Sequence, residues 1–231
     1  MPGRIVVATA VALLAAQSAG AQDMRAICQR ALHPPVGAWS EFRARGGSEA
    51  GRTMRFSAVG RETHGDTAYI WLEFVIHGLG KGEMQGVGDT ITMITKVLAP
   101  GFGPGMELAR THIIKLGSMP AMEMPVRGHS PDAGPSMLDD CERSRVVGWE
   151  QVTVPAGSFR ALHVRDAESG ADTWVDPDLP FGMVKGGDAS DSSLVELEAH
   201  GTGATSRITE TPRPYDARLF MQMLTGGRSR P

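Results

Sequence analysis

The sequence predicts a mainly β protein whose strands form an antiparallel sheet that curls or closes into a barrel. Short segments of alternating apolar and polar residues follow one another closely, with little helical periodicity between them. The 29 Gly and 15 Pro supply turns, and their share stays below the level typical of disordered chains. A chain of 231 residues that is 41% hydrophobic can bury one substantial core. We therefore expect one β-rich domain over residues 22–231.

The charge balance excludes two classes of partner. Charged residues make up 21% of the chain, and the formal net charge is -3. Without an overall basic field, neither a nucleic acid nor an anionic membrane surface is an expected partner. No apolar stretch after residue 21 approaches membrane-spanning length, so we do not expect an integral membrane protein.

Residues 1–21 have the pattern of a signal peptide. Arg4 precedes an apolar run from Ile5 to Ala16, and Ala19-Gly20-Ala21 matches the small-residue cleavage pattern. The run is shorter than the roughly 20 residues that a membrane-spanning helix needs, which makes an uncleaved membrane anchor the weaker alternative. We therefore expect a mature chain that begins at Gln22, is exported and resides in the periplasm.

Cys28 and Cys141 are the two cysteines of the chain. An even number of cysteines in an oxidising compartment favours a disulfide between them. Neither belongs to a Cys-x-x-Cys motif or has a neighbouring His, so a redox-active or catalytic thiol is the weaker alternative.

The first half of the domain predicts one short helix followed by strands. Asp23 can cap a helix that runs to Leu32 and ends before Pro34. Gly46-Gly47 separates two alternating segments, as in a half-buried hairpin. Residues 68–76 are apolar on both faces and predict a central strand covered on each side. The strands expected here are residues 39–44, 54–58, 68–76, 90–98 and 110–116.

Residues 117–139 interrupt this pattern with a run rich in Met, Pro and Gly. Loops longer than about 12–15 residues in compact domains are usually functional or disordered, so we expect a loop that serves as a lid. Strands return at residues 146–154, 160–165, 173–175, 183–185, 194–199 and 204–209, and residues 216–224 predict a short C-terminal helix.

The most specific local pattern is a hairpin around residues 149–164. Val152 and Val154 precede a turn in which Pro155 presets its backbone angle and Gly157 can adopt a left-handed conformation. Phe159 then restarts the alternation.

With the Trp174 strand that ends at Pro177 and the Gly182-Met-Val184-Lys185 segment, this hairpin resembles bacterial exported proteins of the superfamily that includes the outer-membrane lipoprotein carriers. The resemblance covers residues 141–199, and residues 22–140 match only in general style. It implies an antiparallel sheet curled into an incomplete barrel around a helix or lid, with an apolar concave face able to hold acyl chains. No catalytic residue is implied by it.

Large apolar side chains on the expected strands are the candidate ligand contacts. In a half-closed barrel the concave face is where a small-molecule site forms. The alternative for each residue is an ordinary core closed by the terminal helices. The candidates are Trp71, Phe74, Met93, Trp149, Trp174 and Phe181.

A cluster of methionines predicts an alternative function. Met119, Met122 and Met124 lie within six residues, with His129 and His112 nearby, and thioethers suit Cu(I). Methionine also fills irregular apolar grooves, so packing within a lid explains the same cluster.

The sequence offers little support for catalysis. It contains no Gly-x-Ser-x-Gly, His-Glu-x-x-His, phosphate-binding loop or dinucleotide-binding motif, and its seven His are scattered singly. His77 and His163 are expected to be half-buried polar residues of strands. We therefore predict a non-enzymatic protein without a cofactor that binds or carries a lipid or other apolar molecule. The alternatives are a copper-binding protein and a structural subunit of an envelope complex, with another envelope protein as partner.

Overall fold

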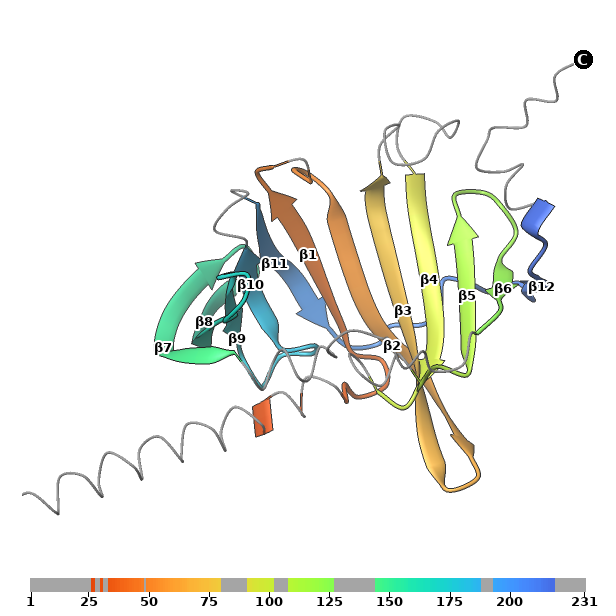
Figure 1. Cartoon of the computed structure of the whole chain (residues 1–231), viewed down its shortest axis with the longest axis horizontal. Helices are drawn as coiled ribbons and strands as arrows, with labels where there is room; N and C mark the ends of the chain where they lie inside the picture. The colour runs from red at the N-terminus through yellow and green to blue at the C-terminus, as the bar shows by residue number, and fades with distance from the viewer. Residues whose placement is uncertain are drawn as a thin grey trace, which may run out of the picture.

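The computed structural model describes residues 26–27, 30, 33–47, 49–79, 91–101, 108–126, 144–187 and 193–218. The chain is mainly β and forms one large sheet that is not closed into a barrel (Figure 1). The strand order is β12-β6-β5-β4-β3-β2-β1-β11-β10-β9-β8-β7. The strands are β1 (Trp39–Arg45), β2 (Thr53–His64), β3 (Thr67–Leu79), β4 (Ile91–Ala99), β5 (Thr111–Leu116), β6 (Met122–Met124), β7 (Arg145–Val154), β8 (Gly157–Arg165), β9 (Asp172–Val175), β10 (Met183–Gly187), β11 (Leu194–Gly201) and β12 (Arg213–Pro214).

The predicted fold class is confirmed, and the sheet contains one parallel pair of strands. Neighbouring strands pair antiparallel except β12 and β6, which pair parallel. Among the described residues, α-helical conformation is limited to residues 26–27, 30 and 217–218, within the two segments predicted as terminal helices. No helix in the described ranges is long and apolar enough to cross a membrane.

The alternation that predicted the strands also determines which side chains they bury. In β1, Phe42 and Ala44 are buried while the intervening Arg43 is half-exposed. The β2–β3 hairpin is longer than predicted, because the strands continue through polar residues to a turn at Gly65, where the backbone φ is +61°. The strand β3 lies centrally in the sheet, as the apolar run of residues 68–76 predicted.

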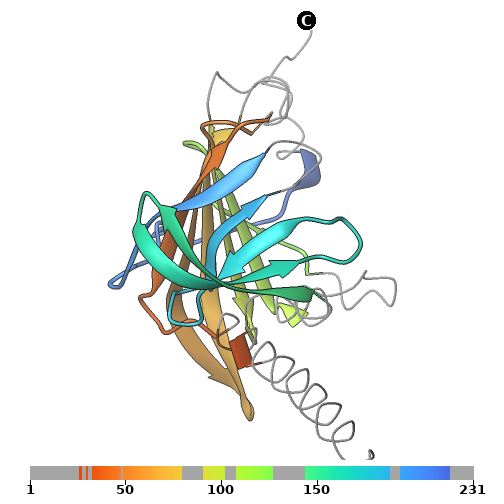
Figure 2. The same ribbon diagram turned by 90° about the vertical axis from the view of Figure 1, so that its left-hand side faces the viewer.

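The end of the sheet formed by β7–β10 folds back over one face. Val152, Val154 and Ala161 pack in one cluster with Phe42 of β1 and Leu197 of β11. Figure 2 shows these strands crossing β1–β3 at a steep angle. At the tip of the β7–β8 hairpin, the Ala156 N–H donates to the Leu197 carbonyl oxygen over 3.1 Å. The sheet is therefore concave on the face that carries Phe42, which we call the concave face.

The chain after β11 crosses the other face of the sheet, which we call the strap face. In Figure 1 this segment passes behind β2–β5 to reach β12. Residues 204–209 were predicted as a strand, and this prediction is wrong. Their polar groups bind side chains of the sheet instead: the Ser206 hydroxyl and the Arg207 N–H both donate to the Glu73 carboxylate.

Part of the predicted lid loop is a strand. Met122–Met124 forms β6, which pairs with β5 through Ile114 and His112. Met122 is buried, so an apolar side chain and main-chain pairing draw this part of residues 117–139 into the sheet. Residues 127–139 lie outside the described residues. The predicted signal peptide and the predicted Cys28–Cys141 disulfide also lie outside them.

Candidate functional site

The register of the central strands determines which side chains share the concave face. Phe56 of β2 pairs with Phe74 of β3, which pairs with Thr95 of β4. Side chains of paired residues in an antiparallel sheet point to the same side, and every second residue of a strand returns to that side. The next row on this face therefore lies two residues further along each strand. This row is Met54, Ile76 and Met93, and all six side chains are half-buried.

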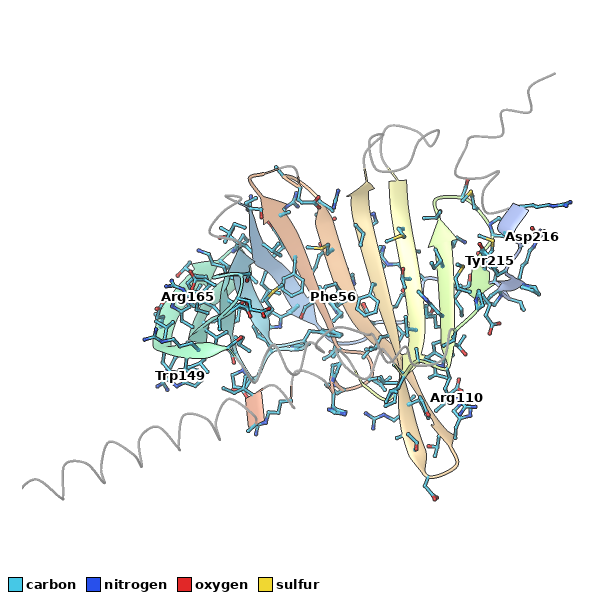
Figure 3. The ribbon with its side chains drawn as sticks, in the orientation of Figure 1. Phe56, Arg110, Trp149, Arg165, Tyr215 and Asp216 are labelled. Atoms are coloured by element: carbon cyan, nitrogen blue, oxygen red, sulfur yellow. The ribbon has the colours of Figure 1, made fainter. Side chains whose placement is uncertain are left out.

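Phe56 lies at the centre of an aromatic group on this face. Its ring centroid is 5.4 Å from that of Phe42, 5.3 Å from that of Phe74 and 5.9 Å from that of Phe181. The pairs are tilted or edge-to-face, arrangements that aromatic rings prefer. Figure 3 labels Phe56 in the middle of the sheet. Sequence reasoning missed Phe56 as a candidate, although the alternation of residues 54–58 contained the signal.

A tight loop between β9 and β10 places Phe181 on the concave face. Phe181 has a positive φ of 61°, which is uncommon for a residue with a side chain, and is 5% exposed. The Ser40 hydroxyl donates to the Pro180 carbonyl oxygen over 2.7 Å and ties this loop to β1. Phe181 packs against Ala58 and Leu72, so it covers one part of the concave face.

Trp71, a predicted ligand contact, lies on the strap face, opposite Phe74. Its indole N–H donates to Glu62 over 2.7 Å, and the Lys96 ammonium lies 4.7 Å from the ring centroid. The hydrogen bond from Trp71, with a further one from His64, lowers the pKa of Glu62. The six predicted contacts therefore do not form one site: Phe74, Met93 and Phe181 share the concave face, and Trp71 does not.

Trp149 and Trp174 lie at the curled end of the sheet. Trp149 is 43% exposed on β7, with the Arg160 guanidinium 5.0 Å from its ring centroid. Trp174 of β9 packs against the cluster of Phe42 and Leu197, and it also borders a polar cluster.

That polar cluster joins β7, β8 and β9 around His163. His163 is 7% exposed, with Nδ1 2.8 Å from Glu150 Oε1 and Nε2 2.7 Å from Asp172 Oδ1. Its ring stacks on Trp174 at 4.4 Å between centroids, and the Trp174 N–H donates to Glu150 Oε2. Both ring nitrogens lie within hydrogen-bond distance of carboxylates, one from β7 and one from β9. The cluster is built to hold three strands together.

The carboxylates of this cluster are strongly stabilised in their charged form. Arg165 donates to both oxygens of Asp172, over 2.7 and 3.0 Å. These hydrogen bonds, together with the one from His163, lower the pKa of Asp172 to about 2. The hydrogen bonds from Trp174 and then His163 lower the pKa of Glu150.

The structure describes the three methionines of the predicted copper site. Met122 and Met124 lie two residues apart in β6, so both side chains point to the concave side. Met124 pairs there with His112 of β5. Met122 is buried, Met119 lies in the turn before β6, and His129 lies outside the described residues. Burial lowers the pKa of His112. Among the described residues, no three His, Cys, Asp or Glu side chains are grouped to hold a metal ion.

The described residues line cavities at two places along the sheet. One of about 210 Å³ lies at the foot of β2 and β3 and is lined by His33, Arg61, Ala68, Tyr69, Ile70 and Pro100. Arg61 pairs with Ile70, so both lie on the same face as Leu72 and Phe74. A second cavity of about 600 Å³ lies along β6 and β12 and is lined by Arg110, Glu123, Met124, Pro125, Val126, Pro212, Pro214 and Tyr215.

Two solved structures are similar to this chain at low identity. One is a protein of Parabacteroides distasonis, provisionally described as a lipoprotein, with 14% identity and a TM-score of 0.35 over 74% of this chain and 98% of the other. The second is a protein of Bacteroides fragilis, provisionally described as exported and YmcC-like in fold, with 10% identity and a TM-score of 0.35 over 74% of this chain and 99% of the other. Neither is described as a lipoprotein carrier, and scores this low carry no conclusion about function. No protein-family model and no curated protein matches the chain.

Proposed function

We propose that this protein is an exported, non-enzymatic binding protein that holds an apolar ligand, such as an acyl chain, on the concave face. The observation that carries the proposal is the group of half-buried apolar side chains around Phe56 and Phe74, on a face towards which the sheet curls. Each methylene that moves from water onto this face contributes about 0.8 kcal/mol. No covalent step is required.

Arg61 is suited to the polar end of such a ligand. It lines the cavity at the foot of β2 and β3, and its register partner Ile70 lies on the same face as Phe74, although Phe181 covers Ile70 and Leu72. A guanidinium at one end of an apolar face matches an amphiphile with a carboxylate or phosphate at one end. We therefore propose an anionic amphiphile over a neutral hydrocarbon.

The test is the mass of the protein as its native host exports it, purified without detergent. We expect the native mass to exceed the denatured mass by several hundred daltons, with the excess extracted into organic solvent as an amphiphile. An excess of about 63 Da per chain would instead favour copper at the methionine cluster. Equal masses, together with no uptake of a fluorescent fatty acid by the purified protein, would contradict the proposal.

A variant that fills the concave face tests whether the ligand binds there. Thr95→Trp places a large ring between Phe74 and Ile114, the register partners of Thr95, and should reduce fatty-acid binding at least tenfold. The matched control is Thr111→Trp, since Thr111 is also half-buried but lies on the strap face. Equal loss of binding in both variants would contradict the assignment of the concave face.

A further inference from the structure

The two edges of the sheet differ in how they are protected. At one edge, β12 is two residues long and contains Pro214, which cannot donate a main-chain hydrogen bond. At the other edge, β7 has ten residues and no proline, and its shielding is limited to two charged residues and one bulge. Soluble proteins usually shield an exposed edge strand with prolines, charges, bulges or short length, because its free N–H and C=O groups pair with other chains.

The free part of β7 is its first seven residues. The burial pattern of the strand shows exposed or half-buried residues up to Gln151, followed by buried Val152 and Val154, which pack into the curl. Within the free part, Val146 is 38% exposed, Val147 52% and Trp149 43%. Three exposed apolar side chains on a strand that, among the described residues, pairs on one side only indicate an interaction surface.

The register of β7 with β8 shows which of its side chains share a face. Val147 is the extra residue of a bulge, because Val146 pairs with Val164 and Gly148 pairs with His163. Val146 and Trp149 therefore point to one side of the sheet. Arg145 and Glu150, which pair with Arg165 and Ala161, point to the other side.

This arrangement is complementary to itself. If two β7 strands pair antiparallel about a twofold axis at Gly148, Arg145 lies opposite Glu150 of the partner subunit. On the other side, Val146 lies opposite Trp149 of the partner subunit, with Val147 remaining the bulged residue of each strand. Opposite charges and apolar pairs across antiparallel strands are stabilising. Gly148 carries no side chain, so two backbones can approach closely at the axis.

We propose that the occupant of this edge is a second copy of this chain, and that the protein forms a twofold dimer by pairing β7 with β7. The dimer joins two sheets edge to edge and covers the exposed apolar residues of both. It pairs the charges of Arg145 and Glu150, whereas moving the axis by two residues, to Glu150, would place the two Glu150 side chains opposite each other. The twofold contact is closed, so it predicts dimers and not filaments.

The test is the molar mass of the full purified protein by sedimentation equilibrium over a range of concentrations. We expect a dimer for the wild type and a monomer for Val147→Lys, because lysine on an edge strand opposes pairing. The matched control is Val36→Lys, since Val36 is 51% exposed but lies before β1, and it should remain dimeric. A monomeric wild type at every concentration, or a Val147→Lys variant as dimeric as the control, would overturn the proposal.

A charge exchange tests the register. Arg145→Glu alone and Glu150→Arg alone each create two like-charge pairs in the dimer, and each should weaken self-association by roughly tenfold. Because Glu150→Arg also removes the acceptor of the His163 and Trp174 N–H groups, its matched control is Glu150→Gln, which creates no like-charge pair and should associate more tightly than Glu150→Arg. An equimolar mixture should form a heterodimer, because both cross-pairs are then of opposite charge. A mixture that associates no better than either variant alone would overturn this register, and a monomeric chain that instead captures an extended segment of another protein would overturn the choice of occupant.

Discussion

Glu73 holds the segment after β11 against the strap face of the sheet. It lies in β3, is 1% exposed, and accepts hydrogen bonds from the Ser206 hydroxyl over 2.7 Å and from the Arg207 N–H over 3.0 Å. Burying a carboxylate is costly unless donors satisfy it. Here the donors come from a segment 133 residues or more along the chain, so one buried charge fixes where the C-terminal segment crosses the sheet.

Replacing Glu73 by Gln should lower the free energy of unfolding by about 1.5–3 kcal/mol. An amide keeps the size of the carboxylate but has one acceptor oxygen, and it turns N–H groups towards the donors of Ser206 and Arg207. Chemical denaturation provides the measurement. The control Glu41→Gln changes a side chain that is 35% exposed and should cost less than about 0.5 kcal/mol. Equal losses in the two variants would show that the strap contacts contribute nothing.

Asp172 should make stability depend on pH in the acid range. Its pKa in the folded protein is about 2, below its ordinary value of 3.8, because Arg165 and then His163 donate to it. A carboxyl whose pKa is lower in the folded state stabilises the fold above the unfolded pKa, and this contribution is lost as the pH falls from about 4 to 2.

In Asp172→Asn we therefore expect a smaller fall in the thermal unfolding midpoint between pH 4 and pH 2 than in the wild type, and a lower midpoint at pH 7. Asp178→Asn is the control, because the Asp178 side chain is 88% exposed. It should follow the wild-type pH profile. Parallel acid profiles for Asp172→Asn and the wild type would contradict the role of the cluster in holding β7, β8 and β9 together.

The segment between β11 and β12 stabilises the sheet although it is not a strand. Ile208 is 6% exposed and packs with Val75, Ile94 and Ile113 on the strap face. Beside it, Lys115 forms an ion pair with Glu210, and this hydrogen-bonded contact lowers the pKa of Glu210. The segment between β11 and β12 therefore covers the apolar side chains of β3–β5 on the strap face.

Ile208→Ala should destabilise the protein by about 2–5 kcal/mol, because it removes a buried side chain and leaves a cavity against the sheet. The measurement is again chemical denaturation. Leu108→Ala is the matched control, since Leu108 is 54% exposed and its loss should cost less than about 0.5 kcal/mol. A similar small effect in both variants would mean that the packing of Ile208 on the sheet contributes little to the free energy of unfolding.

The curled end of the sheet is joined to its middle through one cluster around Phe42. Phe42 is fully buried and packs with residues of β7, β8, β10 and β11. Since strands from both halves of the chain contribute to this cluster, we expect one cooperative unfolding transition. Phe42→Ala should lower the free energy of unfolding by about 3–5 kcal/mol. Far-ultraviolet circular dichroism and tryptophan fluorescence should report the same shifted midpoint, and separate midpoints would indicate two independent units.

The positions of most strands follow from the order of amino acids, because alternation and turn residues act over short distances. The hairpin of Val152 and Val154 is one case, since its Pro and Gly residues determine the turn locally. Local patterns failed at residues 204–209, which were predicted as a strand but bind Glu73 instead of pairing with a neighbouring strand.

Alternation also separates Trp71 from Phe74 onto opposite faces of β3, but it does not say which face is concave. Both faces of this strand are apolar, so no local pattern distinguishes them. The choice is made by contacts between distant segments: Ala156 against Leu197 folds one end of the sheet over Phe74's face, and Ser206 against Glu73 covers the other. Strand positions are thus a property of short stretches of sequence, whereas the candidate binding face and the place of β7 at the end of the described sheet depend on contacts between distant segments.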